Sequence, residues 1–248
     1  MAIVRRFWWL LLLTFTTCLP VPNLPTYLIY LRVQVPIILL NILNWNWDDL
    51  IYKPFKDGIP FIHCWTGEYF ELFFFTTLAY FVIDAVWVMV APQSVKSPMT
   101  IIQHHVAVIL YLIIPYRCPP FRFLMGVCMS VELNTWFLIA RRVFNKQGSP
   151  PWTIDLPYLF SVRVKLISIC FYISWIAIRC LLYPYVLVVF YKMVGVGIVG
   201  EKDKWNLAVG ACLQIVFCVM NAKWTLDLAN SKMRQWRSKS GVQVSEGL

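Results

Sequence analysis

The chain has 248 residues, of which 60 % are hydrophobic and 14 % charged, and its mean hydropathy is +0.66. A water-soluble domain of 29.1 kDa needs far more polar surface than this, so a soluble globular protein is excluded. The formal net charge of +10 would suggest nucleic acid in a soluble chain. Here the Lys and Arg residues lie mostly between apolar runs, so lipid headgroups are the expected partners and nucleic acid is not.

The apolar residues form long continuous runs rather than short alternating segments. Inside a bilayer every backbone N–H and C=O must find a partner within the protein, and long apolar runs satisfy this as helices rather than as a β-barrel. The sequence therefore predicts an all-α protein, a polytopic transmembrane helical bundle of about six spanning helices plus a short N-terminal apolar segment.

The N-terminal apolar segment, residues 7–20, follows two arginines and resembles a signal peptide, but no small-residue cleavage site follows it. It is too short to span a membrane alone, so we expect an uncleaved, interfacial or partly inserted helix. A first span is predicted near residues 27–43. Residues 1–45 then hold these two segments, and residues 46–68 form a polar, aromatic loop on the non-cytosolic side.

Five clearer spans follow at residues 69–90, 99–116, 121–140, 164–191 and 205–229. They define the main transmembrane domain, residues 69–233, and leave residues 234–248 as a disordered cytosolic tail. Lys and Arg residues gather in that tail, in the loop after the fourth span and before the first span. The positive-inside rule therefore places both termini in the cytosol.

Two of the eight cysteines, Cys64 and Cys118, lie in loops that this topology places on the non-cytosolic side, where a disulfide is chemically permitted. The sequence does not give the separation of their Cα atoms, so their pairing stays open. The sequence has no CxxC pair, and no HxxxH or HxxE spacing puts two ligands on one helix face, so we expect no metal site.

Five ionisable side chains lie deep inside the predicted spans, where such groups cost about 3 kcal/mol or more and normally face the bundle interior. They are Asp84, His104, His105, Glu132 and Arg179. With a rise of about 1.5 Å per residue, the two carboxylates and the His pair fall at similar depth on three consecutive spans. Arg179 falls near the midplane of the next span.

Two interpretations of these groups stay open. In the first they neutralise one another and so stabilise the packing of the helices. His would pair with Glu or Asp, and Arg with the remaining carboxylate. In the second they surround a polar cavity in which an imidazole deprotonates or orients a lipid nucleophile while a carboxylate fixes its tautomer. Adjacent helical residues point about 100° apart, so His104 and His105 cannot face one narrow site in the same way, and one of them is expected to be structural.

Five segments within residues 69–233 follow one another in the order YFVIDAVW, QHHVAVILYL, VELNTWFLIARR, FYISWIAIRCLLYP and NAKWTLDLANSKMR. Together they resemble the TLC (TRAM, Lag, CLN) domain. The resemblance implies a helical bundle that encloses a lipid-accessible cavity in the endoplasmic reticulum or a related membrane. The matching positions are Asp84, His104, His105, Glu132, Thr135, Phe137, Arg141, Arg179 and Pro184.

Within that family, ceramide synthases transfer an acyl group from acyl-CoA to a sphingoid base and need the His pair, whereas other members look non-catalytic. This chain departs from the synthase pattern, because Ala107 and Val108 follow Val106 without the synthase-like Thr and CMSVELNT replaces the D-x-x-D region, keeping only Glu132. The resemblance therefore favours a protein that binds or senses lipid and contributes to membrane lipid homeostasis. Its polar cavity would be formed by Asp84, His104, His105, Glu132, Thr135 and Arg179.

The alternative is a ceramide-synthase-like lipid N-acyltransferase with acyl-CoA as co-substrate. In that enzyme His104 or His105 is the general base, and Glu132 or Asp84 orients it. A second alternative is a transporter or trafficking receptor. No other cofactor is expected, membrane lipids are the expected partners, and a homo- or hetero-oligomer stays open.

Overall fold

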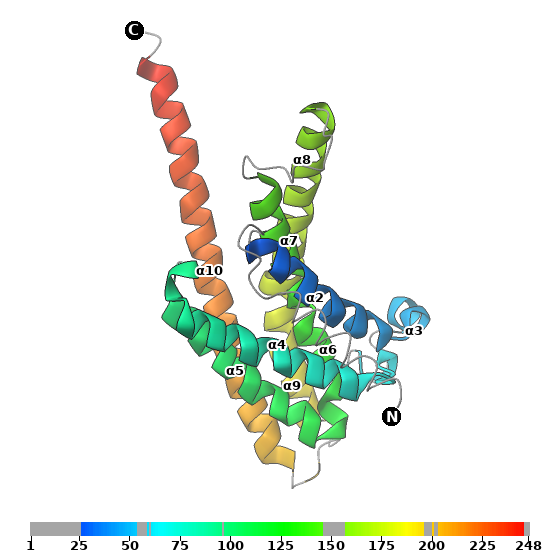
Figure 1. The fold of residues 1–248 in the computed structure, drawn as a ribbon. Helices are drawn as coiled ribbons and strands as arrows, with labels where there is room; N and C mark the ends of the chain where they lie inside the picture. The colour runs from blue at the N-terminus through cyan, green and yellow to red at the C-terminus, as the bar shows by residue number, and fades with distance from the viewer. Residues whose placement is uncertain are drawn as a thin grey trace.

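The structure, a computed structural model, describes residues 26–53, 59, 61–95, 97–145, 157–195, 200 and 203–245. The apolar segment predicted at residues 7–20 lies outside this part of the chain. Apart from one isolated β-bridge between Trp45 and Trp65, every regular element in the described residues is a helix (Figure 1).

Five helices are long and apolar enough to cross a membrane, which confirms the prediction of an all-α polytopic bundle. They are α4 (Phe70–Val90), α5 (Pro98–Arg117), α6 (Arg122–Met129) with α7 (Val131–Asn145), α8 (Pro157–Ser174) with π-helix η5 (Trp175–Leu182) and α9 (Tyr183–Gly195), and α10 (Lys204–Ser245). The first predicted span corresponds to α2 (Thr26–Leu43).

Short helices connect these spans: α3 (Trp47–Tyr52) and the 3₁₀ turns η2 (Ile62–Cys64), η3 (Pro92–Ser94) and η4 (Pro119–Phe121). Helix α4 packs against α5, α7 against α8, α2 against α7 and α4, and α10 against α9 and α5. The buried core lies between these helices and is mainly aromatic and aliphatic.

Helix α10 continues past the other helices toward the C-terminus (Figure 1). It ends at Ser245, so residues 234–245, for which the sequence predicted a disordered tail, continue this helix. Extending a formed helix by one residue costs far less free energy than nucleating a new one, which favours this continuation.

The fourth predicted span is interrupted at Ser130, where α6 ends and α7 begins. Side chains donate hydrogen bonds to three consecutive backbone carbonyls near the break, those of residues 126–128. Asn41 Nδ2 donates to Gly126 O at 2.9 Å, Ser130 Oγ to Val127 O at 2.6 Å, and Tyr183 Oη to Cys128 O at 2.9 Å. Because hydrocarbon offers no water to replace lost backbone hydrogen bonds, these side chains make the break tolerable inside the bundle.

Gly126, just before the break, lies against the rings of Trp45 and Trp65, whose centroids are 5.0 Å apart in an edge-to-face arrangement. A Cβ at this position would collide with Trp65 and lie 2.8 Å from Trp45 Cζ2. Glycine therefore lets the loop before α4 pack directly on α6.

We predict that Gly126→Ala lowers the free energy of unfolding by about 2 kcal/mol, because the added methyl overpacks a tryptophan contact. Thermal unfolding of the purified protein in detergent measures this. Gly195→Ala is the control, since a Cβ there meets nothing within 4 Å. Equal melting temperatures for the two variants would contradict the prediction.

Candidate functional site

We call the six residues Asp84, His104, His105, Glu132, Thr135 and Arg179 the polar layer. They lie on α4, α5, α7 and η5, which belong to four consecutive membrane spans. Within the layer, Asp84 and His105 meet directly, with 3.1 Å between Oδ2 and Nε2, and their side chains are only 13 % and 6 % exposed. The carboxylate thus occupies one ring nitrogen of His105 and fixes the orientation of the ring.

His104 points to different neighbours, as its position next to His105 on α5 requires. Its ring makes edge-to-face contacts with Phe217 and Trp224 of α10, at centroid distances of 5.9 and 5.4 Å. Its Nδ1 is buried and has no hydrogen-bond partner among the described residues. His105 is therefore held by a carboxylate and His104 by aromatic rings.

Arg179 lies in η5, and Pro184 explains why a π-helix forms there. Proline has no N–H to donate to the carbonyl four residues back, and its ring collides with that carbonyl in an α-helix. The preceding residue, Tyr183, instead donates to Ile178 O, five residues back. The wider turn places Arg179 inside the bundle, where it is only 9 % exposed.

The guanidinium of Arg179 binds amide and hydroxyl oxygens. Its Nε donates to Asn134 Oδ1 at 2.7 Å, its Nη1 to Asn221 Oδ1 at 2.7 Å and its Nη2 to Thr135 Oγ1 at 3.4 Å. Its charge also lies over the rings of Trp175 and Trp224, at 4.8 and 5.4 Å from their centroids. Within the described residues this side chain forms no ion pair with Glu132, the carboxylate that remains after Asp84 pairs with His105.

That remaining carboxylate, Glu132, is 3 % exposed and accepts a hydrogen bond from Gln34 Nε2 at 3.3 Å. The same nitrogen donates to Tyr80 Oη at 3.1 Å, so Gln34 joins α2 to both α4 and α7. The polar layer is thus a set of contacts between helices rather than one converging constellation.

Sequence reasoning missed the amides that complete this layer: Gln34, Asn134 and Asn221. Each is at most 3 % exposed. An Asn or Gln in an apolar run carries the same signal as an ionisable group, because its amide must also be satisfied by a neighbouring helix.

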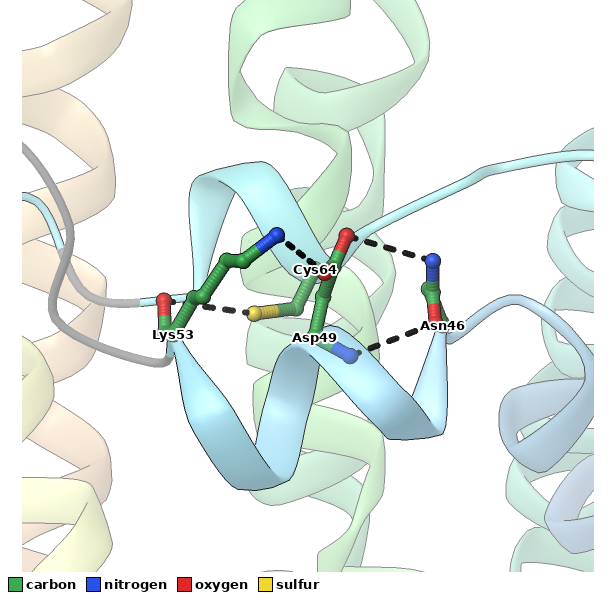
Figure 2. A network of polar contacts seen from close by, with 4 residues as sticks. All are labelled: Asn46, Asp49, Lys53 and Cys64. Atoms are coloured by element: carbon green, nitrogen blue, oxygen red, sulfur yellow. Dashed lines mark hydrogen bonds and ion pairs between the residues drawn. The ribbon is translucent and has the colours of Figure 1, made fainter.

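Cys64 and Cys118, the pair whose disulfide the sequence left open, are both buried free thiols in this structure. Figure 2 shows the Cys64 thiol directed at the backbone oxygen of Lys53, at 3.8 Å, beside the Asp49–Lys53 ion pair. The Cys118 thiol donates to Asp203 Oδ1 at 3.2 Å and accepts from Asn206 Nδ2 at 3.1 Å. Each thiol is thus held by a different element.

Burial and the Asp203 carboxylate raise the pKa of Cys118 to about 11, and burial together with Asp49 raises the pKa of Cys64. Neither thiol is therefore ionised at neutral pH. Because the thiolate is the reactive form in disulfide chemistry, both groups are expected to be inert. No cluster of three or more His, Cys, Asp or Glu side chains able to hold a metal ion occurs among the residues that the structure describes.

A cavity of about 290 Å³ lies beside the α6–α7 break. Its lining is mostly apolar and contains no residue of the polar layer. Helix α2 and the loop after it supply one wall, and α6, α7 and the end of η5 supply the other. The lining residues are Ile38, Asn41, Ile42, Trp45, Trp47, Leu50, Phe61, Gly126, Val127, Met129, Ser130, Leu133 and Leu182.

The family model described as the TLC domain matches residues 26–230. The match includes the polar layer, and it also includes α2, which lies upstream of the segments that carried the resemblance. Comparison with curated proteins and with solved structures found no match.

We predict that Asn134→Leu lowers the free energy of unfolding by about 2 kcal/mol or more, because it leaves a buried charged donor, Arg179 Nε, without its acceptor. Thr135→Val removes the longer contact to the same guanidinium and should cost less. Melting temperatures in one detergent compare the two variants. A loss from Thr135→Val as large as that from Asn134→Leu would contradict this ranking.

Alkylation of the denatured protein without reducing agent should modify Cys64 and Cys118 as two separate thiols. Peptide mass spectrometry detects the two labels, and a reduced sample provides the reference. A cross-linked pair of peptides that disappears on reduction would show that the disulfide forms.

Proposed function

The chain belongs to the TLC domain family, and from this premise we propose that it binds lipid inside the membrane and contributes to membrane lipid homeostasis without catalysing acyl transfer. Its site of action is the endoplasmic reticulum or another endomembrane. The observation that carries the proposal is the largely apolar cavity beside the α6–α7 break. A cavity of this kind within a membrane bundle suits an apolar ligand.

The contacts of the polar layer support a structural role for it. A general base must have a ring nitrogen available to the proton that it removes. His105 Nε2 is engaged by Asp84, and the Glu132 carboxylate by Gln34. Arg179 is bound by Asn134 and Asn221. Together with the Gln34–Tyr80 bond, these bonds join six elements of the bundle, α2 with α4 and α7, α4 with α5, and η5 with α7 and α10, and so hold the walls of the cavity in place.

A ceramide-synthase-like N-acyltransferase is the second candidate, and one observation favours it. Asp84 orients the imidazole of His105 as a carboxylate orients a catalytic histidine, and Nδ1 of both His104 and His105 is buried without a hydrogen-bond partner among the described residues. In such an enzyme the amine of a sphingoid base would donate its proton to one of these nitrogens, and acyl-CoA would supply the acyl group.

Lipid mass spectrometry of the purified protein, with and without added acyl-CoA and sphingoid base, separates the two candidates. We expect a co-purifying lipid and no acylated product. His104→Ala and His105→Ala should likewise give no acylated product, and His63→Ala, which alters the one histidine outside the spans, is the matched control. Acylated product that is lost in either span variant but retained in His63→Ala would overturn the proposal in favour of the enzyme.

A further inference from the structure

Among the residues that the structure describes, the cavity beside the α6–α7 break presents no free hydrogen-bonding side chain to a ligand. Asn41 uses both ends of its amide, accepting from Trp45 Nε1 at 3.0 Å and donating to Gly126 O at 2.9 Å. Ser130 Oγ donates to Val127 O, and Trp47 Nε1 donates to Ile42 O at 3.1 Å. The polar atoms in the wall are therefore occupied, and a polar headgroup placed inside would lose its hydrogen bonds without replacement.

The size of the cavity limits what it holds. A cavity of about 150 Å³ lined by apolar side chains accommodates one benzene molecule, so 290 Å³ accommodates roughly a dozen carbon atoms. A membrane lipid with two long chains is far larger than this. The cavity fits part of one aliphatic chain.

The cavity also reaches the outer surface of the bundle. Three of its lining residues, Ile42, Leu133 and Trp47, are 41 %, 39 % and 48 % exposed. Ile42 and Leu133 lie on membrane helices, so an aliphatic chain can enter the cavity laterally from the lipid bilayer.

Helix α3 indicates which way the aliphatic chain of the ligand runs in the cavity. Its Trp47 and Leu50 line the cavity, while Ile51 and Tyr52 are exposed and Asp48 and Asp49 lie on the same short helix. Exposed apolar and charged side chains on one short helix are typical of the membrane–water interface. A headgroup therefore lies near α3, and the chain runs from there toward the break.

We propose that this cavity takes the end of a single aliphatic chain, with the headgroup left outside beside α3. The ligand is recognised by the shape of its hydrocarbon and not by its headgroup, because the polar side chains in the described part of the wall are already hydrogen-bonded. This assignment deepens the proposed lipid-binding function and rests on it for its biological meaning. The chain comes either from a free fatty acid or from a phospholipid, and the experiment distinguishes these sources.

The test uses protein in phosphatidylcholine vesicles with trace amounts of photoreactive palmitic acid. One probe carries a diazirine at the chain end and the other next to the carboxyl group. We expect the chain-end probe to label residues 126–133 several-fold more than the carboxyl-end probe, as measured by peptide mass spectrometry. A phosphatidylcholine with the same chain-end diazirine forms the second arm. Labelling by either source supports the assignment, and the stronger one identifies the source.

Matched variants locate the label. Leu182→Trp fills the cavity and should reduce labelling of residues 126–133 several-fold, whereas Leu181→Trp, at a neighbouring position that is 64 % exposed, should not. If Leu182→Trp fails to fold, Ile42→Trp narrows the lateral opening, with Leu39→Trp on the exposed side of α2 as its control. Equal labelling by the two fatty acid probes, or labelling that the folded cavity variants leave unchanged, would overturn the inference.

This result is separable from that of the function experiment. A lipid that co-purifies while residues 126–133 remain unlabelled would leave the lipid-binding function standing and disprove this cavity as its site. Labelling of the cavity together with His-dependent acyl transfer would support this cavity as the binding site for an aliphatic chain and would disprove the non-catalytic function.

Discussion

A polar group buried between membrane helices must be satisfied by protein atoms, and the rest of this structure depends on that constraint. Arg179 shows it most clearly, because its guanidinium is held by two asparagine side chains from different helices and flanked by two tryptophan rings. The same constraint accounts for Gln34, which joins α2 to α4 and α7. Without such bonds, apolar helices in hydrocarbon gain little from approaching one another, since lipid tails solvate them equally well.

The constraint also explains how the bundle contains a cavity. A spanning segment broken at Ser130 would leave carbonyls unsatisfied, but Asn41, Ser130 and Tyr183 bind them. These hydrogen bonds occupy both the carbonyls near the break and the side-chain groups that bind them, so neither is available to a ligand. What remains along the wall is hydrocarbon, and this chemistry selects a lipid chain over a headgroup.

Two different local departures from the α-helix thus serve the two regions of the candidate site. At Pro184 the chain widens into a π-helix and directs Arg179 inward, which builds the polar layer. At Ser130 it breaks, and an apolar space opens beside it. The first departure has a visible cause in the sequence, a proline in an apolar run. The second depends on Asn41 and Tyr183, which lie far from Ser130 in the sequence, so no local sequence pattern predicts it.

The sequence by itself determined that the chain is an all-α membrane bundle, where its main spans lie, and that its spans carry ionisable groups at similar depth. These properties follow from hydropathy and helical rise, which act within one segment at a time. Only the tertiary structure decided that Asp84 pairs with His105, that Arg179 binds amides, that the thiols of Cys64 and Cys118 contact different elements, and that no polar-layer residue lines the cavity. Each of these depends on the rotation of one helix against another, which is fixed by side-chain packing between segments distant in sequence.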